Sequence, residues 1–483
     1  MTTLKQKFIS GTIWTVTERL SLQILQLIVS IILSRLLGPS EYGLIGMLTI
    51  FIALSQSVID SGFGSALIQK KDADQIDTSS IFFLNIIIGF ILTITLILTA
   101  PLIANFYNQP ELINITRVLS LNLIINSFGL VQTALLSKSM DFKAQMKASL
   151  IAASTSGLIG IALAYNGFGV WSLVIQMVLN YFIRVILIWN VSRWRPSLVF
   201  SSASIKSMFP FGSRMLLTGL VDTFFLNIYN AFIGKIYSST TLGFYTRATV
   251  FVNAAVLATS LSIEKVTYSA LAPYQDEIST LKQAYRKTIR FSVFLHFPLM
   301  VSLIVLADPM IRFLLTDKWA QSIPYFQLLC VSGIFYPLQL LNLNILKVKG
   351  RSDLVLKLGI IQKLMVILAI FITFRYGIMF LIYGQIITSI FSFFIYSFYS
   401  GRMIMYSQIN QLKDLLPFMV MAIIMGSSMF LFDFIYLPNP FFQLLIKPVI
   451  GVVIYCILNY LAKTTELIEF KKIISNMVER YKS

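Results

Sequence analysis

Long apolar runs, separated by short polar breaks, fill almost the whole chain. The runs are continuous rather than alternating, which is typical of membrane-spanning helices and not of barrel strands. A span needs about 20 residues and a short connection about 10–15 more, so a chain of 483 residues has room for about 14 spans. We therefore predict an all-α integral membrane protein with spans at 10–36, 41–68, 79–104, 112–136, 147–165, 169–191, 207–236, 241–269, 287–308, 322–346, 354–375, 379–400, 414–433 and 441–462.

The composition agrees with this class and excludes others. Hydrophobic residues make up 57% of the chain and charged residues only 12%, whereas a soluble domain carries about 25% charged residues. The same percentages exclude a disordered chain. A chain with only 2 Cys is also not a protein held together mainly by disulfides. Cys330 and Cys456 both fall in predicted spans, and we expect both to be buried free thiols.

Lysine and arginine are distributed unevenly between the two sides of the predicted membrane. With the N-terminus inside, the inner segments hold about 24 basic residues and the outer loops about five. This arrangement puts both termini in the cytoplasm and explains most of the net charge of +18 without a nucleic-acid partner. The segment 464–483 has apolar residues, among them Leu467 and Phe470, at three- and four-residue steps, and is expected to be an amphipathic cytoplasmic tail.

An internal repeat divides the chain. The segment Ser34–Leu44 (SRLLGPSEYGL) is echoed two hundred residues later by Gly234–Phe244 (GKIYSSTTLGF), with the basic residue, apolar pair, polar turn and glycine in register. Such symmetry is typical of transporters. We predict two pseudo-symmetric six-helix lobes, related by an axis along the membrane normal, with two extra helices. The expected boundaries are 1–198 for spans 1–6, 199–405 for spans 7–12, 406–463 for spans 13 and 14, and 464–483 for the tail.

Sequence signatures of catalysis are weak. The chain has no phosphate-binding G-x-x-x-x-G-K-[ST] loop and no paired-Cys or His-cluster metal motif. Its single histidine, His296, lies two residues before Pro298 and is expected to make a packing contact. Asp72 and Asp74 match the D-x-D pattern of glycosyltransferases, but they fall in a short loop that we interpret as solvated. We therefore expect no enzyme activity, no cofactor and no metal.

Polar side chains form stripes along two equivalent spans. On span 1, six polar residues lie close to one line of a helix at about 100° per residue; they are Thr12, Thr15, Arg19, Gln23, Gln26 and Ser30. Span 7, its partner in the repeat, carries Arg214, Thr218 and Asp222 on a broader face. Ionisable groups inside a membrane are costly and usually face a bundle interior or water, so these stripes favour a hydrated cavity.

Spans 2 and 8 add further charges to this hypothetical cavity. Asp60 ends span 2, and Arg247 and Lys265 lie on span 8. The simplest arrangement places spans 1, 2, 7 and 8 around a central, net positive cavity. For any single residue the alternative is local ion pairing or a side chain that reaches the membrane interface.

Four segments resemble a known family. They are Ser34–Leu44, Asp60–Gln69 (DSGFGSALIQ), Ala134–Lys143 (ALLSKSMDFK) and Gly167–Leu173 (GFGVWSL). They resemble the bacterial polysaccharide transporter family, and within it the colanic-acid and teichuronic-acid type of Wzx flippase, of the multidrug/oligosaccharidyl-lipid/polysaccharide (MOP) exporter superfamily. One departure is Glu41, where most such relatives have Asp; the acidic group is kept.

The resemblance implies a flippase. Such proteins move undecaprenyl-pyrophosphate-linked oligosaccharides across the bacterial inner membrane by alternating access, for surface polysaccharides such as lipopolysaccharide and exopolysaccharide. The implied partners are the lipid-linked oligosaccharide and membrane lipids, with a polysaccharide polymerase or chain-length machinery as further candidates. The resemblance supplies no residue-level site, so the charges and polar stripes of the spans lead to three site assignments: an anion site of Arg19, Arg214, Arg247 and Lys265; gating or coupling by Asp60 and Asp222; and a polar cavity stripe of Gln23, Gln26, Ser30 and Thr218.

Two alternatives stay open at this point. A cation-coupled multidrug exporter of the same superfamily would be expected to carry acidic cavity groups, whereas the inner spans here carry more Arg and Lys. A membrane polysaccharide polymerase would be expected to carry a large outer loop, and the longest predicted outer loop, about residues 309–321, is short.

Overall fold

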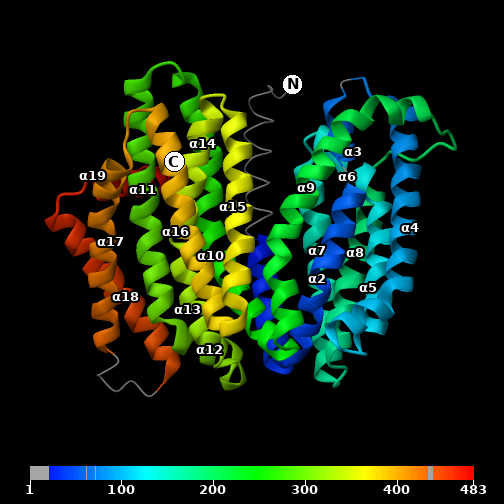
Figure 1. The fold of residues 1–483 in the computed structure, drawn as a ribbon, viewed down its shortest axis with the longest axis horizontal. Helices are drawn as coiled ribbons and strands as arrows, with labels where there is room; N and C mark the ends of the chain where they lie inside the picture. Colours follow the sequence, from blue (N-terminus) through cyan, green and yellow to red (C-terminus); the bar gives the residue numbers. More distant parts are fainter. Residues whose placement is uncertain (1–20, 61, 71, 433–438, 483) are drawn as a thin grey trace. The chain divides into compact units, whose positions relative to one another are not determined.

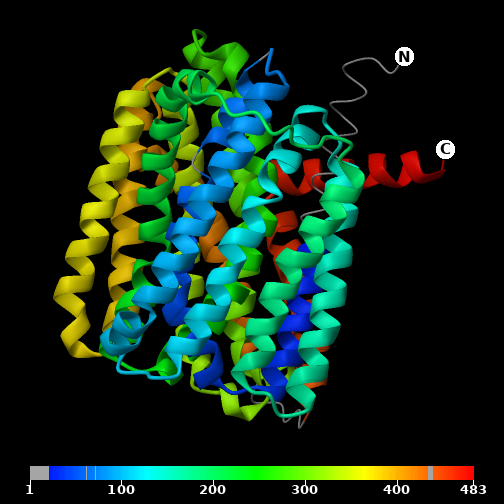
Figure 2. The same cartoon turned by 90° about the vertical axis from the view of Figure 1, so that its right-hand side faces the viewer.

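The computed structural model describes residues 21–60, 62–70, 72–432 and 439–482. In these ranges the regular structure is entirely helical, without a strand, which confirms the all-α class. The chain forms two compact units, Met1–Thr246 and Arg247–Ser483. Within each unit the long helices run side by side, and Figure 2 shows the C-terminal helix turned crosswise to the long helices of the second unit, to which it belongs (Figures 1 and 2).

The first unit is built from long helices joined by short turns. A helix over Ser21–Leu36 precedes the labelled elements. They are α2 (Pro39–Asp60), α3 (Phe63–Gln69), α4 (Gln75–Tyr107), α5 (Leu112–Ser127), α6 (Leu130–Lys138), α7 (Phe142–Tyr165), α8 (Val170–Val191), α9 (Ser202–Ile236) and the beginning of α10 (Ser239–Leu271).

Among its described residues, the second unit holds the rest of α10 and eleven further helical segments before the tail. They are η1 (Ala272–Tyr274), α11 (Ile278–Val305), α12 (Ala307–Leu315), η2 (Asp317–Trp319), α13 (Ser322–Gly333), α14 (Tyr336–Val348), α15 (Ser352–Thr373), η3 (Phe374–Tyr376), α16 (Ile378–Met403), α17 (Gln408–Leu431) and α18 (Pro440–Leu461). The tail itself is α19 (Thr465–Lys482).

Most of the predicted spans correspond to helices long and apolar enough to cross a membrane. Among the described residues there are 11 such helices, or 12 if the bent pair α5 and α6 counts as one span. The chain is therefore a multi-pass membrane protein. The first predicted span begins before the described residues, and α10 is not among the 11, so the count of 14 stays a prediction.

The predicted span 112–136 is not one straight helix. α5 ends at Ser127, α6 begins at Leu130, and the two are bent by 42°. No proline signals this break. Gly129 lies at the bend, where an added Cβ would come within 3.0 Å of the Val185 side chain, so the bend is packed tightly against α8.

Exposed apolar side chains cover the outer faces of the helices. On α15 the residues Leu356, Ile360, Leu364, Leu368 and Phe371 recur at three- and four-residue steps, and all are exposed. A soluble protein rarely exposes a continuous apolar stripe of this length, whereas a membrane span presents such a stripe to lipid.

This outward-facing surface corrects one expectation about the cysteines. Cys330 is buried as expected, but Cys456 is exposed. It lies on α18, close to the exposed Val452 and Val453, on a face that a soluble protein would bury and that a membrane protein turns towards lipid.

Buried aromatic side chains anchor each unit. In the first unit Phe82 of α4 packs edge-on against Trp189 and Trp194 in a cluster that joins α3, α4, α6 and α9. In the second unit Phe294 of α11 packs against Phe418 of α17 and Tyr455 of α18. These contacts hold helices that are distant in the sequence in one bundle.

Candidate functional site

A pocket of about 480 Å³ lies between α2, α8 and α9 in the first unit. All three helices belong to segments that are long and apolar enough to cross a membrane, so the polar groups of the pocket lie on membrane-spanning helices. The lining residues are Ile45, Thr49, Ile52, Ala53, Gln56, Ser57, Asp60, Met177, Tyr181, Thr223, Leu226 and Asn227. The pocket thus brings hydroxyl, amide and carboxylate groups together.

One face of α2 supplies the larger share of the lining. Its contributions from Ile45 to Asp60 recur at steps of one, three and four residues, which is the spacing of a single helix face. The polar end of this face is joined by a hydrogen bond, because the Gln56 Nε2 donates to Asp60 Oδ1 at 3.3 Å. The hydroxyl of Thr49 donates to the Ile45 carbonyl one turn earlier at 3.1 Å, and its oxygen can still accept a bond from a ligand.

A glycine allows α2 and α9 to approach closely beside the pocket. Gly62 has a φ of 69°, a conformation that favours glycine. A Cβ at this position would also lie 2.6 Å from the Met215 Cβ and 2.7 Å from the Gly212 carbonyl oxygen of α9. Gly62 therefore meets two requirements at once, a left-handed turn and a contact with the α9 backbone.

α8 and α9 complete the pocket. Met177 and Tyr181 come from consecutive turns of α8, and Thr223 and Asn227 from consecutive turns of α9. The Asn227 Nδ2 donates to the Thr223 carbonyl at 2.9 Å, which holds the amide against its own helix. One turn before Thr223 on α9, Gly219 lies so close to Ser57 that an added Cβ would come within 3.1 Å of the Ser57 hydroxyl.

Arg184 places a positive charge near this group. It lies one turn beyond Tyr181 on α8 and interacts electrostatically with both Asp60 and Tyr181. Its Nε is buried without a hydrogen-bond partner. A buried, unpaired guanidinium nitrogen is a strong donor for an anionic or hydroxyl group, so the site has one acidic and one basic group in addition to its neutral polar lining.

The structure brings one of the predicted site residues to this pocket, Asp60. Gln23, Gln26 and Ser30 lie on the helix Ser21–Leu36. Arg214, Thr218 and Asp222 lie exposed on α9, and Arg247 lies half-buried on α10 in the second unit. Arg19 falls outside the described residues, as does the side chain of Lys265.

Arg214, in the polar stripe of α9, lies on a different face from the pocket residue Thr223. Arg214 precedes Thr223 by nine residues, which is two and a half turns of helix, so the two side chains leave α9 on opposite sides. Asp222 leaves the helix about 100° from Thr223 but only about 40° from Leu226, which also lines the pocket, so it lies at the edge of the pocket face. The anion site built on Arg214 therefore stays a prediction separate from this pocket.

Sequence reasoning missed most of the pocket. The recurrence of Thr49, Gln56, Ser57 and Asp60 on one face of span 2 was a usable signal, of the same kind as the stripe on span 1. Tyr181 and Thr223 gave a weaker signal, because each has only one polar neighbour a turn away on the same helix face, Arg184 and Asn227 respectively. They become notable only when α2, α8 and α9 are known to adjoin.

A second polar cluster lies in the second unit, where α11, α17 and α19 meet. Arg286 donates from Nε and Nη2 to the two carboxylate oxygens of Asp414, both at 2.6 Å. Arg290 donates to Glu466 of α19 at 2.6 and 3.1 Å and to Asp414 at 3.2 Å. The Tyr406 hydroxyl donates to Asp414 Oδ2 at 2.5 Å. This ionic cluster is fully paired, which indicates a structural role.

The environment of the ionic cluster changes two pKa values outside the spans. Burial raises the pKa of Tyr406, and its hydrogen bond to Asp414 raises it further. Burial also acts to raise the pKa of Glu466, but the hydrogen bonds and charge of Arg290 outweigh this effect and hold the pKa below its ordinary value. Tyr406 is therefore neutral and Glu466 ionised at neutral pH.

Other candidate groups have structural partners. His296 is buried, with Nδ1 2.8 Å from the Thr259 hydroxyl and Nε2 3.1 Å from the Gly333 carbonyl. Asp74 forms a capping box with Asp77 at the start of α4, which gives one half of the D-x-D pattern a helix-capping role. In the part of the chain that the structure describes, no three His, Cys, Asp or Glu residues are grouped to hold a metal ion.

The sequence has recognisable relatives. Residues 32–324 match the model of a family described as polysaccharide biosynthesis protein. The teichuronic acid biosynthesis protein TuaB of Bacillus subtilis (strain 168) is 29% identical over 357 residues, which cover 73% of this chain and 74% of that protein. The lipopolysaccharide biosynthesis protein WzxC of Escherichia coli (strain K12) is 25% identical over 375 residues, covering 76% and 75%.

The fold also matches a solved structure. The lipid II flippase MurJ, in an inward closed conformation, superposes with a TM-score of 0.78 at 17% identity, covering 96% of this chain and 100% of that one. At this identity the likeness shows the fold, that of a multi-helix membrane transporter.

Proposed function

The chain belongs to the family of polysaccharide biosynthesis proteins, and on that premise we propose that it is a flippase for lipid-linked oligosaccharides. Its substrate would be an undecaprenyl-pyrophosphate-linked repeat unit, moved from the cytoplasmic to the outer leaflet of the bacterial inner membrane by alternating access. The observation that carries the proposal is the polar pocket on the spanning helices α2, α8 and α9. A protein with a purely structural role would have no need for a polar pocket on its membrane-spanning helices.

The chemistry of the pocket suits a glycan headgroup. Sugar hydroxyls both donate and accept hydrogen bonds, and the pocket offers matching partners in the hydroxyls of Thr49, Ser57 and Thr223 and the amides of Gln56 and Asn227. Arg184, with its buried unpaired Nε, offers a donor for an anionic group. Since an unpaired ionised group costs many kcal/mol to bring into hydrocarbon, a polar surface on the spans lowers the barrier to crossing.

The topology belongs to the same proposal. We infer 14 spans with both termini in the cytoplasm, two six-helix lobes over 1–198 and 199–405, extra spans over 406–463 and a cytoplasmic tail over 464–483. The excess of basic residues in the inner loops supports the orientation, and the repeat of Ser34–Leu44 in Gly234–Phe244 supports the two lobes. In this arrangement the chain transports and does not catalyse a covalent reaction.

The remaining assignments from the sequence stay part of the proposal. Arg19, Arg214, Arg247 and Lys265 are proposed to attract the pyrophosphate, and Asp222 and Asp60 to take part in gating or coupling. The expected partners are the lipid-linked substrate and membrane lipids, and a polysaccharide polymerase or chain-length machinery that would receive the exported unit.

Transport by the purified full-length chain tests the proposal. In proteoliposomes that contain an undecaprenyl-pyrophosphate-linked oligosaccharide, a glycosidase that cannot cross the membrane reports which glycans face outward. The unchanged chain should expose the inner pool, and Thr49→Val should slow exposure about threefold to tenfold by removing one hydrogen-bonding hydroxyl. Thr95→Val is the matched control, because Thr95 makes the same bond to its own helix, to the Ile91 carbonyl at 2.8 Å, on α4 away from the pocket.

Two results would contradict the proposal. The first is no exposure of the inner pool by the unchanged chain. The second is equal slowing by Thr49→Val and Thr95→Val, which would separate the pocket from transport. In cells, deletion of the gene should make lipid-linked repeat units accumulate on the inner leaflet, and mass analysis of these lipids would identify the glycan.

The alternative of a cation-coupled drug exporter has one observation in its favour, the acidic Asp60 in the pocket. An organic cation would need that carboxylate, so a drug exporter should pump a cationic dye, lose this efflux in Asp60→Asn, and expose no glycan. The opposite outcome, glycan exposure with no dye efflux by the unchanged chain, favours the flippase.

A further inference from the structure

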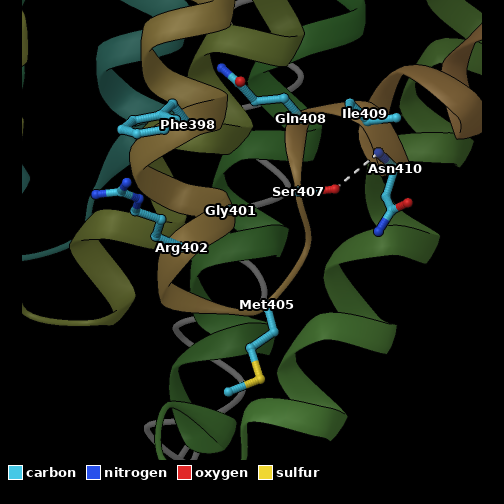
Figure 3. Close-up of a pocket in the computed structure, with 8 residues that line it drawn as sticks. All are labelled: Phe398, Gly401, Arg402, Met405, Ser407, Gln408, Ile409 and Asn410. Atoms are coloured by element: carbon cyan, nitrogen blue, oxygen red, sulfur yellow. Dashed lines mark hydrogen bonds between the residues drawn. The ribbon is translucent and has the colours of Figure 1, made fainter.

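A second pocket lies in the second unit, where the turn from α16 to α17 leaves the membrane. It encloses about 460 Å³ and is lined by Phe398, Gly401 and Arg402 of α16, Met405 and Ser407 of the turn, and Gln408, Ile409 and Asn410 of α17 (Figure 3). Both helices are candidate membrane spans. α16 ends at Met403 and α17 begins at Gln408. The pocket therefore lies at the membrane–water interface rather than at the centre of the bilayer.

The turn that shapes the pocket is held rigidly. Met405 has a φ of 51°, and the following Tyr406 is buried with its hydroxyl bonded to Asp414. Gly401 permits the turn to fold back on α16, because an added Cβ would lie 2.5 Å from the Tyr406 carbonyl oxygen. Ser407 caps α17 by accepting a hydrogen bond from the Asn410 N–H at 3.3 Å (Figure 3). A ligand would meet a preformed site.

The electrostatics of the pocket favour an anion. Arg402 is exposed, and its guanidinium carbon lies 4.2 Å from the centre of the Phe398 ring, so an aromatic face rather than a carboxylate orients it. The lining contains no acidic residue. The neighbouring Asp414 is already bonded to Arg286 and Tyr406, and Lys413, one turn beyond Ile409, is also exposed.

The helix faces beside the pocket are apolar and suited to contact with lipid hydrocarbon. On α16, Phe391, Phe394 and Phe398 are exposed in succession, towards the middle of the span. On α17, Ile409, Leu412 and Leu416 form a second exposed row. A molecule with its charged part at Arg402 could therefore lay an apolar part along either row, as a phospholipid does with its headgroup at the interface and its acyl chains in the bilayer.

We propose that this pocket binds the phosphate headgroup of an anionic phospholipid of the surrounding bilayer. Arg402 pairs with the phosphate, Ser407 and Asn410 offer neutral hydrogen bonds to the glycerol or headgroup hydroxyls, and the acyl chains follow the rows of α16 and α17. With the orientation proposed above, the lipid belongs to the cytoplasmic leaflet. The site is separate from the pocket in the first unit, and lipid binding here does not depend on what the protein transports.

Binding can be measured on the purified full-length chain in nanodiscs of phosphatidylcholine to which phosphatidylglycerol is added. The unchanged chain should retain phosphatidylglycerol through exchange, detected by native mass spectrometry. Arg402→Gln should weaken that retention about fivefold, the contribution expected of one basic residue near a membrane surface. Arg375→Gln is the matched control, because Arg375 is also exposed and also lies over a phenylalanine, Phe374, at 5.5 Å.

Each outcome decides the proposal. Loss of retention in Arg402→Gln, with Arg375→Gln unchanged, supports the site. Equal loss in both variants would indicate general surface electrostatics and overturn it, as would equal retention of phosphatidylcholine and phosphatidylglycerol. Displacement of the lipid by inorganic phosphate alone would show an ion site instead. Thermal unfolding of both variants in lipid-free detergent should match that of the unchanged chain, which separates binding from folding.

Discussion

Gly43 of α2 packs against the first turn of α10, and Gly243 of α10 packs in the same way against the first turn of α2. A Cβ added at Gly43 would meet the backbone of Ser239, and one added at Gly243 would meet the backbone of Pro39, in both cases far below 3.0 Å. The hydroxyls of Ser40 and Ser239 lie 3.3 Å apart between them. The two glycines hold equivalent positions in the repeat, so the first turns of α2 and α10 pack against each other with local two-fold symmetry, all within the first unit.

Alanine at either glycine should destabilise the protein. Both positions are packed against backbone atoms, which cannot move aside as a flexible side chain can, so Gly43→Ala and Gly243→Ala should each cost about 1–3 kcal/mol or more, the range for overpacked sites. The midpoint of thermal unfolding in detergent measures the loss. Gly359→Ala on α15 is the control, because an added Cβ there meets nothing within 4 Å and alanine favours a helix. A midpoint for Gly43→Ala that equals the control would contradict the tight contact.

The repeat illustrates what the sequence could and could not predict. The in-register match of Ser34–Leu44 with Gly234–Phe244 identified the equivalent turns, but not their contact, because similarity of two segments does not say that they touch. The run 354–375 matched the span Ser352–Tyr376 within two residues, since a span facing lipid is apolar almost throughout. The break after Ser127 was missed because no proline marks it.

The pocket was harder to predict than the spans for a physical reason. A helix face can be read from one segment, and Thr49, Gln56 and Asp60 could have been found in that way. Tyr181 and Thr223 join them only through the packing of α8 and α9 beside α2, which depends on close contacts such as Gly62 with Gly212. Those contacts depend on side-chain shape and backbone approach, which periodicity does not report.

Asp60 and Arg184 should act as a pair in transport. Because their charges interact across the pocket, removing one leaves the other uncompensated on a spanning helix. Asp60→Asn and Arg184→Gln should each slow glycan exposure about fivefold to tenfold, and the double variant should be no slower than either, which corresponds to a coupling of about 1–1.4 kcal/mol, within the range for contacting residues. The initial rate of glycan exposure in proteoliposomes measures all four proteins. Strictly additive losses would show that the two residues act independently.

Membrane potential should drive the proposed transport without an ion gradient. A pyrophosphate carries about two negative charges, and moving each outward across an inside-negative membrane gains about 2.3 kcal/mol per 100 mV, about 4.6 kcal/mol in total. A potential set by potassium and valinomycin, with no proton or sodium gradient, should therefore raise the rate of glycan exposure when the inside is negative and lower it when the sign is reversed. A rate that ignores the sign of the potential would contradict this prediction.

Acid should release the tail helix α19 from α11. The pKa of Glu466 is held below its ordinary value in the folded protein, so the folded state favours the ionised form. The stabilisation is complete above the unfolded-state pKa of about 4.3 and is lost as the pH falls through the lowered native value. A spin label at Ser475→Cys, in a background with Cys456→Ala, should become mobile only below about pH 4.3.

Two glutamate variants separate this contact from its neighbour. Glu466→Gln should leave the label mobile at neutral pH, because it removes the charge that Arg290 binds from Nε at 2.6 Å. Glu469→Gln should leave the midpoint unchanged, since the Lys287–Glu469 pair is exposed and exposed pairs contribute little. A shift of the midpoint by Glu469→Gln as large as the effect of Glu466→Gln would place the acid response elsewhere on α19.

Removing one hydroxyl from the ionic cluster should weaken the second unit without dismantling it. Tyr406→Phe keeps the ring, which lies 6.1 Å from the Tyr285 ring, but deletes the bond from the hydroxyl to Asp414 Oδ2. Because Arg286 still donates to both oxygens of Asp414, the loss should be about 1.5–3 kcal/mol, the value of a hydrogen bond to a charged group, and not the larger cost of an unpaired buried charge. The free energy of unfolding in detergent measures it. Tyr376→Phe, whose side chain is exposed, should change stability by about 0.5 kcal/mol or less, and equal losses from the two tyrosines would mean that the Asp414 bond contributes nothing.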